Sequence, residues 1–158
     1  MHICTYNIRT FREEEKRKEF EEEISQIKWD IIGLCETKCK GEHLTKLKSG
    51  HTLYTCGNPN DNKNGVGFLI NKKIDKKVTS IKGINERLAL LTLEINPRYK
   101  IKIIQVYAPT TSHDDQEVIE IYQEIENLLK EDKTYFTIIM GDFNAKIGKK
   151  EDNKETAM

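Results

Sequence analysis

Short apolar runs and charged amphipathic segments alternate along the chain, the pattern of a protein that mixes strands and helices. Eight apolar runs have the length and the β-branched or aromatic content of strands. They cover residues 3–8, 30–35, 51–56, 66–70, 77–81, 87–95, 101–107 and 135–140. Turn-forming residues separate several of these runs, above all the stretch 58–65 and the sequence Asn96-Pro97-Arg98.

Two segments repeat their apolar residues at the spacing of an amphipathic helix. In residues 12–28, the side chains of Phe20, Ile24 and Ile27 fall on one face, and charged residues fill most other positions. A second predicted helix follows residue 112. Its apolar face is formed by Val118, Tyr122, Ile125 and Leu129. We expect Ser112 to cap this helix, because its hydroxyl can accept a hydrogen bond from the unpaired N–H groups of the first turn.

Several predicted strands, such as 88–93 and 101–106, carry apolar residues on both faces, so both faces must be covered. Two sheets packed on each other, with helices outside them, provide that cover. We therefore predict an α/β fold built as a layered sandwich. A chain of 158 residues has the length of one domain. We expect this domain to span residues 1–148, followed by a polar tail at 149–158.

Charged residues are balanced overall but unevenly distributed. The chain has 26 Lys and Arg and 26 Asp and Glu residues, so its net charge does not indicate a basic nucleic-acid-binding protein. Residues 58–104 contain ten basic and four acidic side chains, whereas residues 113–132 contain one basic and eight acidic ones. One face could therefore attract a phosphate backbone while another repels it. The alternative is an ordinary solvated, lysine-rich surface.

The four cysteines are expected to be free thiols. Cys35, Cys39 and Cys56, together with His43, invite interpretation as a zinc site. However, Cys35 lies inside an apolar run, and the cysteines do not form Cys-x-x-Cys pairs. Free thiols are therefore the favoured interpretation, and they suit an intracellular protein.

Polar residues follow four of the predicted strands at the point where each strand ends. They are Asn7, Glu36, Tyr107, and the pair Asp142 and Asn144. In open α/β architectures, the C-terminal ends of the strands border the functional crevice. Ordinary explanations exist, since Asn7 could cap a turn, Glu36 could be a surface acid and Tyr107 a core-edge aromatic. Asp142 needs hydrogen-bond partners or a metal at the end of a buried strand, and the whole set indicates a catalytic cleft.

Five sequence motifs occur in the order and at the intervals of a known superfamily. They are Thr5-Tyr6-Asn7-Ile8-Arg9, Gly33-Leu34-Cys35-Glu36-Thr37-Lys38, Gly65-Val66-Gly67-Phe68-Leu69, Val106-Tyr107-Ala108-Pro109 and Gly141-Asp142-Phe143-Asn144-Ala145. On these motifs the whole chain resembles the endonuclease/exonuclease/phosphatase superfamily. The surrounding residues are most similar to the endonucleases of non-LTR retrotransposons and to the craniofacial development protein 2-like proteins derived from them. The resemblance implies a four-layered α/β/β/α sandwich that is incomplete at its C-terminus.

The resemblance also implies a role for each polar residue. Glu36 and Asn7 match the family's ligands for Mg²⁺ or Mn²⁺, hard cations that prefer oxygen ligands. Asp142 matches the residue that activates the attacking water, and Asn144 matches the residue that orients this aspartate and contacts the phosphate. Tyr107 matches the tyrosine that hydrogen-bonds the phosphate as charge develops. Asn7 belongs with Tyr107, Asp142 and Asn144 among the implied catalytic residues.

Two further positions are implied to face the substrate, and one family motif does not occur. Lys38 matches a lysine near the metal-binding glutamate of abasic-site enzymes, which implies an electrostatic role. Thr110 stands where those enzymes usually carry asparagine, which favours another specificity. The family completes its site with a Ser/Asp-Asp-His motif. The histidines of this sequence lie elsewhere, at His2, His43, His51 and His113.

These matches imply a metal-dependent DNA endonuclease of retrotransposon origin. Because the histidine motif does not occur, we expect the domain to be truncated and to be inactive or impaired as this chain. The first alternative is a non-catalytic remnant or domesticated fragment that acts by binding. The second is a small-molecule or lipid phosphodiesterase of the same superfamily.

The expected partner is DNA, and the expected cofactor is Mg²⁺ or Mn²⁺. No apolar stretch reaches the length that spans a bilayer, and residues 1–6 are interpreted as a strand rather than a signal peptide. We therefore expect an intracellular protein without a membrane partner, which is nuclear if it acts on chromosomal DNA.

Overall fold

A computed structural model describes residues 1–110, 114–131 and 134–145 as nine strands, two α-helices and one short 3-10 helix. In chain order the elements are β1 (Ile3–Asn7), α1 (Glu14–Ser25), β2 (Ile31–Cys35), β3 (Glu42–Lys46), β4 (Thr52–Cys56), β5 (Val66–Ile70), η1 (Asp75–Lys77), β6 (Val78–Asn85), β7 (Leu88–Asn96), β8 (Tyr99–Tyr107), α2 (Asp115–Lys130) and β9 (Phe136–Asp142). The expected boundary at 148 and the expected tail 149–158 lie outside the described residues.

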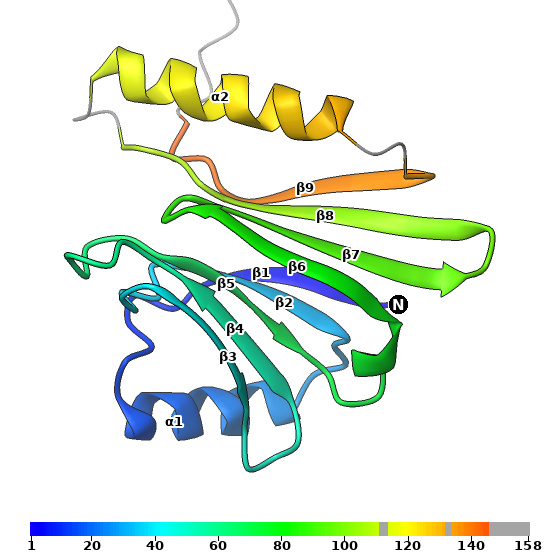
Figure 1. Cartoon of the computed structure of the whole chain (residues 1–158). Helices are drawn as coiled ribbons and strands as arrows, with labels where there is room; N and C mark the ends of the chain where they lie inside the picture. Colours follow the sequence, from blue (N-terminus) through cyan, green and yellow to red (C-terminus); the bar gives the residue numbers. More distant parts are fainter. Residues whose placement is uncertain (111–113, 132–133, 146–158) are drawn as a thin grey trace, which may run out of the picture.

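The strands form two sheets that are stacked face to face. Sheet A has the order β1-β2-β5-β4-β3, and sheet B has the order β6-β7-β8-β9. Helix α1 covers the outer face of sheet A, and α2 covers the outer face of sheet B (Figure 1). The predicted four-layered α/β/β/α sandwich is therefore confirmed.

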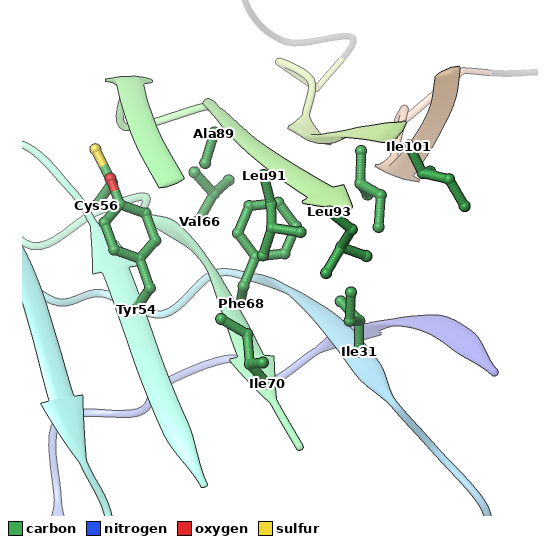
Figure 2. Close-up of a cluster of buried hydrophobic side chains, with 11 residues drawn as sticks. Ile31, Tyr54, Cys56, Val66, Phe68, Ile70, Ala89, Leu91, Leu93 and Ile101 are labelled. Carbon is green, nitrogen blue, oxygen red and sulfur yellow. The ribbon is translucent and has the colours of Figure 1, made fainter. Parts of the chain in front are cut away.

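The largest apolar cluster fills the space between the two sheets (Figure 2). Phe68 and Ile70 reach into it from sheet A, and Leu91 and Leu93 reach into it from sheet B. All four side chains are fully buried. Burying a side chain of this size stabilises a fold by roughly 1.5–3 kcal/mol relative to leaving it exposed. This cluster therefore fixes how the edges of the two sheets face each other.

Helix α1 is shorter than predicted. It runs from Glu14 to Ser25, whereas the sequence pattern predicts residues 12–28. Phe20 and Ile24 are buried against sheet A as expected. Ile27 lies beyond the end of the helix and is 55% exposed, so its predicted place on the buried face is wrong.

Helix α2 begins two residues later than predicted and packs through a different set of apolar residues. Asp114 caps it, with a side chain that accepts a hydrogen bond from the backbone N–H of Gln116. The predicted cap, Ser112, lies outside the described residues and is not the N-cap residue. The buried stripe consists of Ile121, Ile125 and Leu128. Of the predicted face, Tyr122 and Leu129 are 49% and 46% exposed and only Ile125 is buried.

The strand predictions hold for the eight apolar runs, and one strand was not predicted. Strand β3 is exposed along its whole length and forms an edge of sheet A. Its sequence, Glu42-His-Leu-Thr-Lys46, has no apolar run, so its strand conformation depends on pairing with β4. No helix in the described ranges is long and apolar enough to cross a membrane.

The four cysteines are free thiols. Cys39 packs in the cluster beneath α1, whereas Cys56 packs in the cluster between the sheets. The thiol of Cys35 donates to the backbone oxygen of Val106 over 3.3 Å. Burial raises the pKa of the Cys35 thiol and of the Cys56 thiol.

The C-terminal ends of four strands meet at one edge of the sandwich. β1 is parallel to β2 in sheet A, and β8 is parallel to β9 in sheet B. β1 and β2 both lie against β9 across the gap between the sheets. Figure 1 shows the ends of β1, β8 and β9 on the same side of the molecule. This edge carries the polar residues that the sequence predicted to be functional.

Candidate active site

The ends of β1, β2 and β9 bring three polar side chains together. The Nδ2 atom of Asn7 donates to Oε1 of Glu36 over 2.9 Å and lies 3.5 Å from Oδ2 of Asp142. Asn7 and Glu36 extend from sheet A, whereas Asp142 ends a strand of sheet B. The cluster therefore forms only when the two sheets are packed on each other.

A tight turn after β9 fixes the orientation of Asp142. Gly141 has a φ of 143°, and a Cβ atom there would lie 1.8 Å from the backbone oxygen of Val106. The backbone N–H of Asn144 donates to Oδ1 of Asp142 over 3.0 Å. The Asn144 side chain donates to the backbone oxygen of Ala108 over 2.8 Å. Asp142 is thus held by its own turn and by the segment after β8.

Tyr107 lies beside Asp142, since the two residues pair in the β8–β9 register. Burial, and then the charge of Glu36 and a hydrogen bond to it, raise the pKa of Tyr107 to about 12. The guanidinium of Arg87 lies 5.4 Å from the centre of the Tyr107 ring, and its Nη1 donates to the Tyr107 backbone oxygen over 3.2 Å. A phenol with so high a pKa stays protonated at neutral pH and can act as a hydrogen-bond donor.

The loops at this edge hold backbone conformations that side chains rarely adopt. Within the described ranges, four residues other than glycine have a positive φ, between 46° and 59°, namely Arg9, Glu36, Lys38 and Asn144. All four lie within three residues of the C-terminal end of β1, β2 or β9. Such backbone strain persists only where the surrounding structure enforces it, and it concentrates at functional sites. Sequence reasoning missed this feature, because only Asn144 is of a type that favours the conformation.

A pocket of about 400 Å³ opens beside Asp142. Its lining includes Thr5, Asn7, Cys35, Asp142, Phe143 and Asn144. The structure therefore gathers Asn7, Glu36, Tyr107, Asp142 and Asn144 into one place. Asn7, Asp142 and Asn144 line the pocket itself. Glu36 and Tyr107 join them through their interactions with Asn7 and with each other, whereas Lys38 and Thr110 do not belong to the pocket lining. Lys38 is half-buried, and its backbone N–H donates to the backbone oxygen of Asn64 over 2.8 Å. Thr110 is also half-buried and lies three residues after Tyr107 in the chain.

Gln105 lies beneath the pocket and was missed by the sequence reasoning. It is fully buried, and its Nε2 donates to Oγ1 of Thr5 and to the sulfur of Cys35, both over 3.0 Å. It therefore ties β8 of sheet B to β1 and β2 of sheet A directly below Asn7 and Glu36. Its Oε1 has no hydrogen-bond partner among the described residues. The sequence does contain a signal for this role: Gln105 lies on the same face of β8 as Ile101 and Ile103, which pack into the core, and a polar residue buried there needs hydrogen-bond partners.

The donor set at this edge suits a hard cation. Glu36 and Asp142 provide carboxylate oxygens, and Asn7 provides an amide whose oxygen accepts from the backbone N–H of Arg9 over 3.1 Å. The described residues contain no group of three His, Cys, Asp or Glu side chains that could hold a metal. Mg²⁺ is nevertheless commonly bound through one or two carboxylates while it keeps several water ligands. The cluster therefore fits Mg²⁺ or Mn²⁺ rather than zinc.

Comparisons with known sequences show the family of the chain. The sequence pattern of the Endonuclease/Exonuclease/phosphatase family matches residues 4–149. Craniofacial development protein 2 of Tragulus javanicus is 32% identical over 151 residues, which is 94% of this chain and 26% of that protein. The protein of the same name from Bos taurus is also 32% identical over 94% of this chain and 25% of its own length. The chain thus spans about a quarter of these curated relatives.

Solved structures share the fold. Humanized D. rerio TDP2 matches with a TM-score of 0.64 and 13% identity, over 92% of this chain and 63% of that one. The 3' phosphatase NExo from Neisseria, bound to a product DNA hairpin, matches with a TM-score of 0.59 and 14% identity over 90% of this chain and 57% of that one. The AP endonuclease LMAP from Leishmania major matches with a TM-score of 0.59 and 13% identity, over 80% of this chain and 46% of that one. At such low identity these likenesses show the fold alone.

Proposed function

The chain belongs to the Endonuclease/Exonuclease/phosphatase family, and from that premise we propose that its domain is a metal-dependent phosphodiesterase that nicks DNA. One observation carries the proposal: the side-chain amide of Asn7 lies within 3.5 Å of carboxylate oxygens of both Glu36 and Asp142, although these residues come from two different sheets. The chain covers about a quarter of its curated relatives, so the activity of the whole protein is part of the proposal.

In this proposal, Glu36 and the amide oxygen of Asn7 hold Mg²⁺ or Mn²⁺. When bound, the cation polarises the scissile phosphate and stabilises the charge of the departing oxygen. The hydrogen bond between Asn7 and Glu36 places the two side chains side by side, and binding of a cation between them requires the amide to turn so that Oδ1 rather than Nδ2 faces Glu36. The strained φ of 55° at Glu36 supports the assignment of this residue as a ligand, since the surrounding loop holds it in a costly conformation.

Asp142 is the proposed general base. Its carboxylate accepts a proton from the water that attacks phosphorus, and a positioned base of this kind contributes about 10²–10⁴-fold to a rate. Asn144 orients it, because the Asn144 backbone N–H is bonded to Oδ1 and leaves Oδ2 facing Asn7. The side-chain amide of Asn144 bonds Ala108 through Nδ2 and keeps its oxygen and a second N–H for the phosphate.

Tyr107 is proposed to donate a hydrogen bond to a non-bridging phosphate oxygen as negative charge develops there. Its pKa of about 12 supports this role, because the hydroxyl keeps its proton at the pH of the reaction. Lys38 is proposed to add positive potential near the substrate, and Thr110 to contact the nucleotide beside the scissile bond.

DNA is the proposed substrate, in preference to a lipid or another small phosphodiester. The names of two structures that share the fold support this choice, since one is an AP endonuclease and another is bound to a product DNA hairpin. Descent from a retrotransposon endonuclease is proposed on the residues around Tyr107 and Gly141.

We further propose that this chain by itself nicks DNA slowly. Among the described residues, no histidine lines the pocket beside Asp142, so the phosphate lacks the imidazole contact that the family's motif would supply. The test is nicking of supercoiled plasmid by the 158-residue chain with Mg²⁺ or Mn²⁺, with and without added imidazole. We expect slow nicking that imidazole accelerates and that Asp142→Asn abolishes. DNA binding without nicking under either condition would favour a fragment that acts by binding alone.

A further inference from the structure

A second polar pocket lies on the outer face of sheet A, between α1 and the strands β3 and β4. Its volume is about 410 Å³, which is in the range of sites that hold ligands. Arg12, Arg17, Lys40 and His43 form its polar wall, and the buried side chains of Cys39 and Leu53 form part of its floor. We call it the basic pocket, because no carboxylate belongs to its lining.

The cations of the basic pocket are not neutralised by the described residues. Arg12 and Lys40 are exposed, and neither side chain makes a hydrogen bond or an ion pair within the described ranges. Arg17 is fixed in place, because its Nε donates to the backbone oxygen of Phe11 over 2.7 Å and its guanidinium lies 5.8 Å from the centre of the Phe11 ring. The pocket thus presents one anchored and two unpaired cations.

Four of the six acidic side chains of α1 are engaged with other residues and do not pair with the cations of the basic pocket. The carboxylate of Glu14 pairs with Lys18 and Lys48, and that of Glu19 pairs with Lys16. Further along the helix, Glu21 is hydrogen-bonded to Ser49, and Glu23 is hydrogen-bonded to Tyr6.

The basic pocket is joined to the candidate active site by hydrogen-bonded loops. The backbone N–H of Ile8 donates to the oxygen of Cys35 over 3.0 Å, and that of Phe11 donates to the oxygen of Thr37 over 2.8 Å. The loop after Asn7 and the loop after Glu36 therefore run side by side toward the pocket. Lys40 follows Glu36 by four residues, so their backbones are at most about 14 Å apart. A duplex strand rises about 3.4 Å per nucleotide along the axis and also winds around it, so this span reaches a phosphate no more than a few nucleotides away.

The opposite flank of the same edge has the opposite charge. A pocket between α2 and the β6–β7 turn is lined by Glu86, Glu117, Glu120 and Glu124, with Arg87 beside them. This flank adjoins the candidate site, because the backbone N–H of Tyr107 donates to the oxygen of Arg87 over 2.8 Å. A phosphate backbone that crosses the site meets repulsion at the acidic pocket beside α2 and attraction at the basic pocket.

We propose that the basic pocket binds a phosphate of DNA a few nucleotides from the scissile one, so that the DNA backbone leaves the active site over the α1 side. Arg12 and Lys40 are the proposed phosphate ligands, and Arg17 with His43 shapes the pocket around them. The inference rests on DNA as the proposed substrate, and it adds the direction in which the DNA backbone leaves the active site. Phosphate contacts of this kind fix register and orientation without reading sequence.

The test compares two double variants in binding to a fluorescent DNA duplex without divalent metal, by anisotropy at several salt concentrations. Arg12→Ala with Lys40→Ala removes the proposed ligands. The control, Lys76→Ala with Lys77→Ala, makes the same charge change in η1, which lies before β6 at the far end of the sandwich from the site (Figure 1). Arg17 stays unchanged, because its bond to Phe11 serves the fold.

We expect the pocket variant to bind about ten-fold more weakly at low salt, and its slope of log K against log salt to shrink by about 1 to 2. The control should stay within about two-fold of the unaltered chain. Equal losses in both variants, no loss in the pocket variant, or no DNA binding by the unaltered chain would each overturn the inference.

Nicking with Mg²⁺, measured separately, distinguishes the two proposals. If nicking depends on Asp142 but both double variants bind alike, only the basic pocket is refuted. If the variants differ but no Asp142-dependent nicking occurs, only the hydrolytic activity is refuted.

Discussion

Asn7 and Asp142 lie 135 positions apart in the chain, yet Nδ2 of Asn7 is 3.5 Å from Oδ2 of Asp142. Asn7 ends β1 in sheet A, and Asp142 ends β9 in sheet B. Their proximity depends on the packing between the sheets, where Gln105 of β8 reaches across to Thr5 and Cys35. A substitution that shifts one sheet against the other should therefore separate these two side chains.

Gly141→Ala should destabilise the protein strongly. The backbone there has a φ of 143°, and the new Cβ would lie 1.8 Å from the backbone oxygen of Val106. We expect the free energy of unfolding to fall by at least about 3 kcal/mol. Urea unfolding followed by the fluorescence of the buried Trp29 measures this loss.

Gly41→Ala is the matched control for Gly141→Ala. Gly41 also has a positive φ, of 64°, but its nearest atom is a flexible ring nitrogen of His43 at 3.7 Å. This substitution should cost about 1 kcal/mol, the usual cost of placing a side chain in the left-handed region. Equal losses at the two glycines would contradict the close approach described between β8 and β9.

Replacements of Gln105 should separate burial of charge from loss of hydrogen bonds. Gln105→Leu loses the bonds to Thr5 and Cys35 but also removes an unpartnered oxygen, so we expect a loss within about 2 kcal/mol. Gln105→Glu buries a carboxylate without a cation and should cost more than about 3 kcal/mol at neutral pH.

The pH dependence of the stability of Gln105→Glu shows whether burial of charge or loss of hydrogen bonds destabilises the variant. Burial should raise the pKa of the new carboxyl above its unfolded value, so protonation favours the folded state. The difference in the free energy of unfolding between Gln105→Glu and the wild type should therefore shrink as the pH falls through the raised pKa. Urea unfolding at a series of pH values measures this, and a deficit that is independent of pH would show that the carboxylate is not buried.

Tyr107 should titrate above its ordinary range. Its pKa is raised from 10.0 to about 12, by burial and then by Glu36. Since the raised pKa favours the protonated folded state, the resulting stability is present below about pH 10 and is lost as the pH rises through about 12. Ring signals of ¹³C-labelled tyrosines in NMR follow this titration, with Tyr107→Phe to assign the signal. Glu36→Gln should lower this pKa, and an unchanged value would show that the two side chains do not interact.

Most of the fold could be predicted from the sequence, because buried strands are recognisable as apolar runs. β5, with all five residues buried, was predicted with its observed bounds. β3 was missed because an exposed edge strand needs no apolar residues and is specified by pairing with β4. The buried face of α2 was misplaced, since apolar residues surround much of that helix and only packing on sheet B selects Ile121 and Leu128.

The candidate site was predictable as a set of positions but not as an arrangement. Asn7, Glu36, Tyr107 and Asp142 each follow or end a strand, which their place in the sequence indicates. Their mutual contacts depend on which strand ends meet across the sheets, and no local pattern encodes that. Gln105 and the left-handed conformation of Glu36 likewise result from tertiary packing.

The central claim is that Glu36 binds the metal while Asp142 acts as the base, and one paired measurement tests it. Binding of Mn²⁺ by electron paramagnetic resonance and plasmid nicking are measured on the same preparations of wild type, Glu36→Gln and Asp142→Asn. We predict that Glu36→Gln weakens Mn²⁺ binding by at least about ten-fold. Asp142→Asn should bind Mn²⁺ within about three-fold of wild type and lose nicking by about 10²-fold or more. Nicking by Asp142→Asn at the wild-type rate would contradict the account.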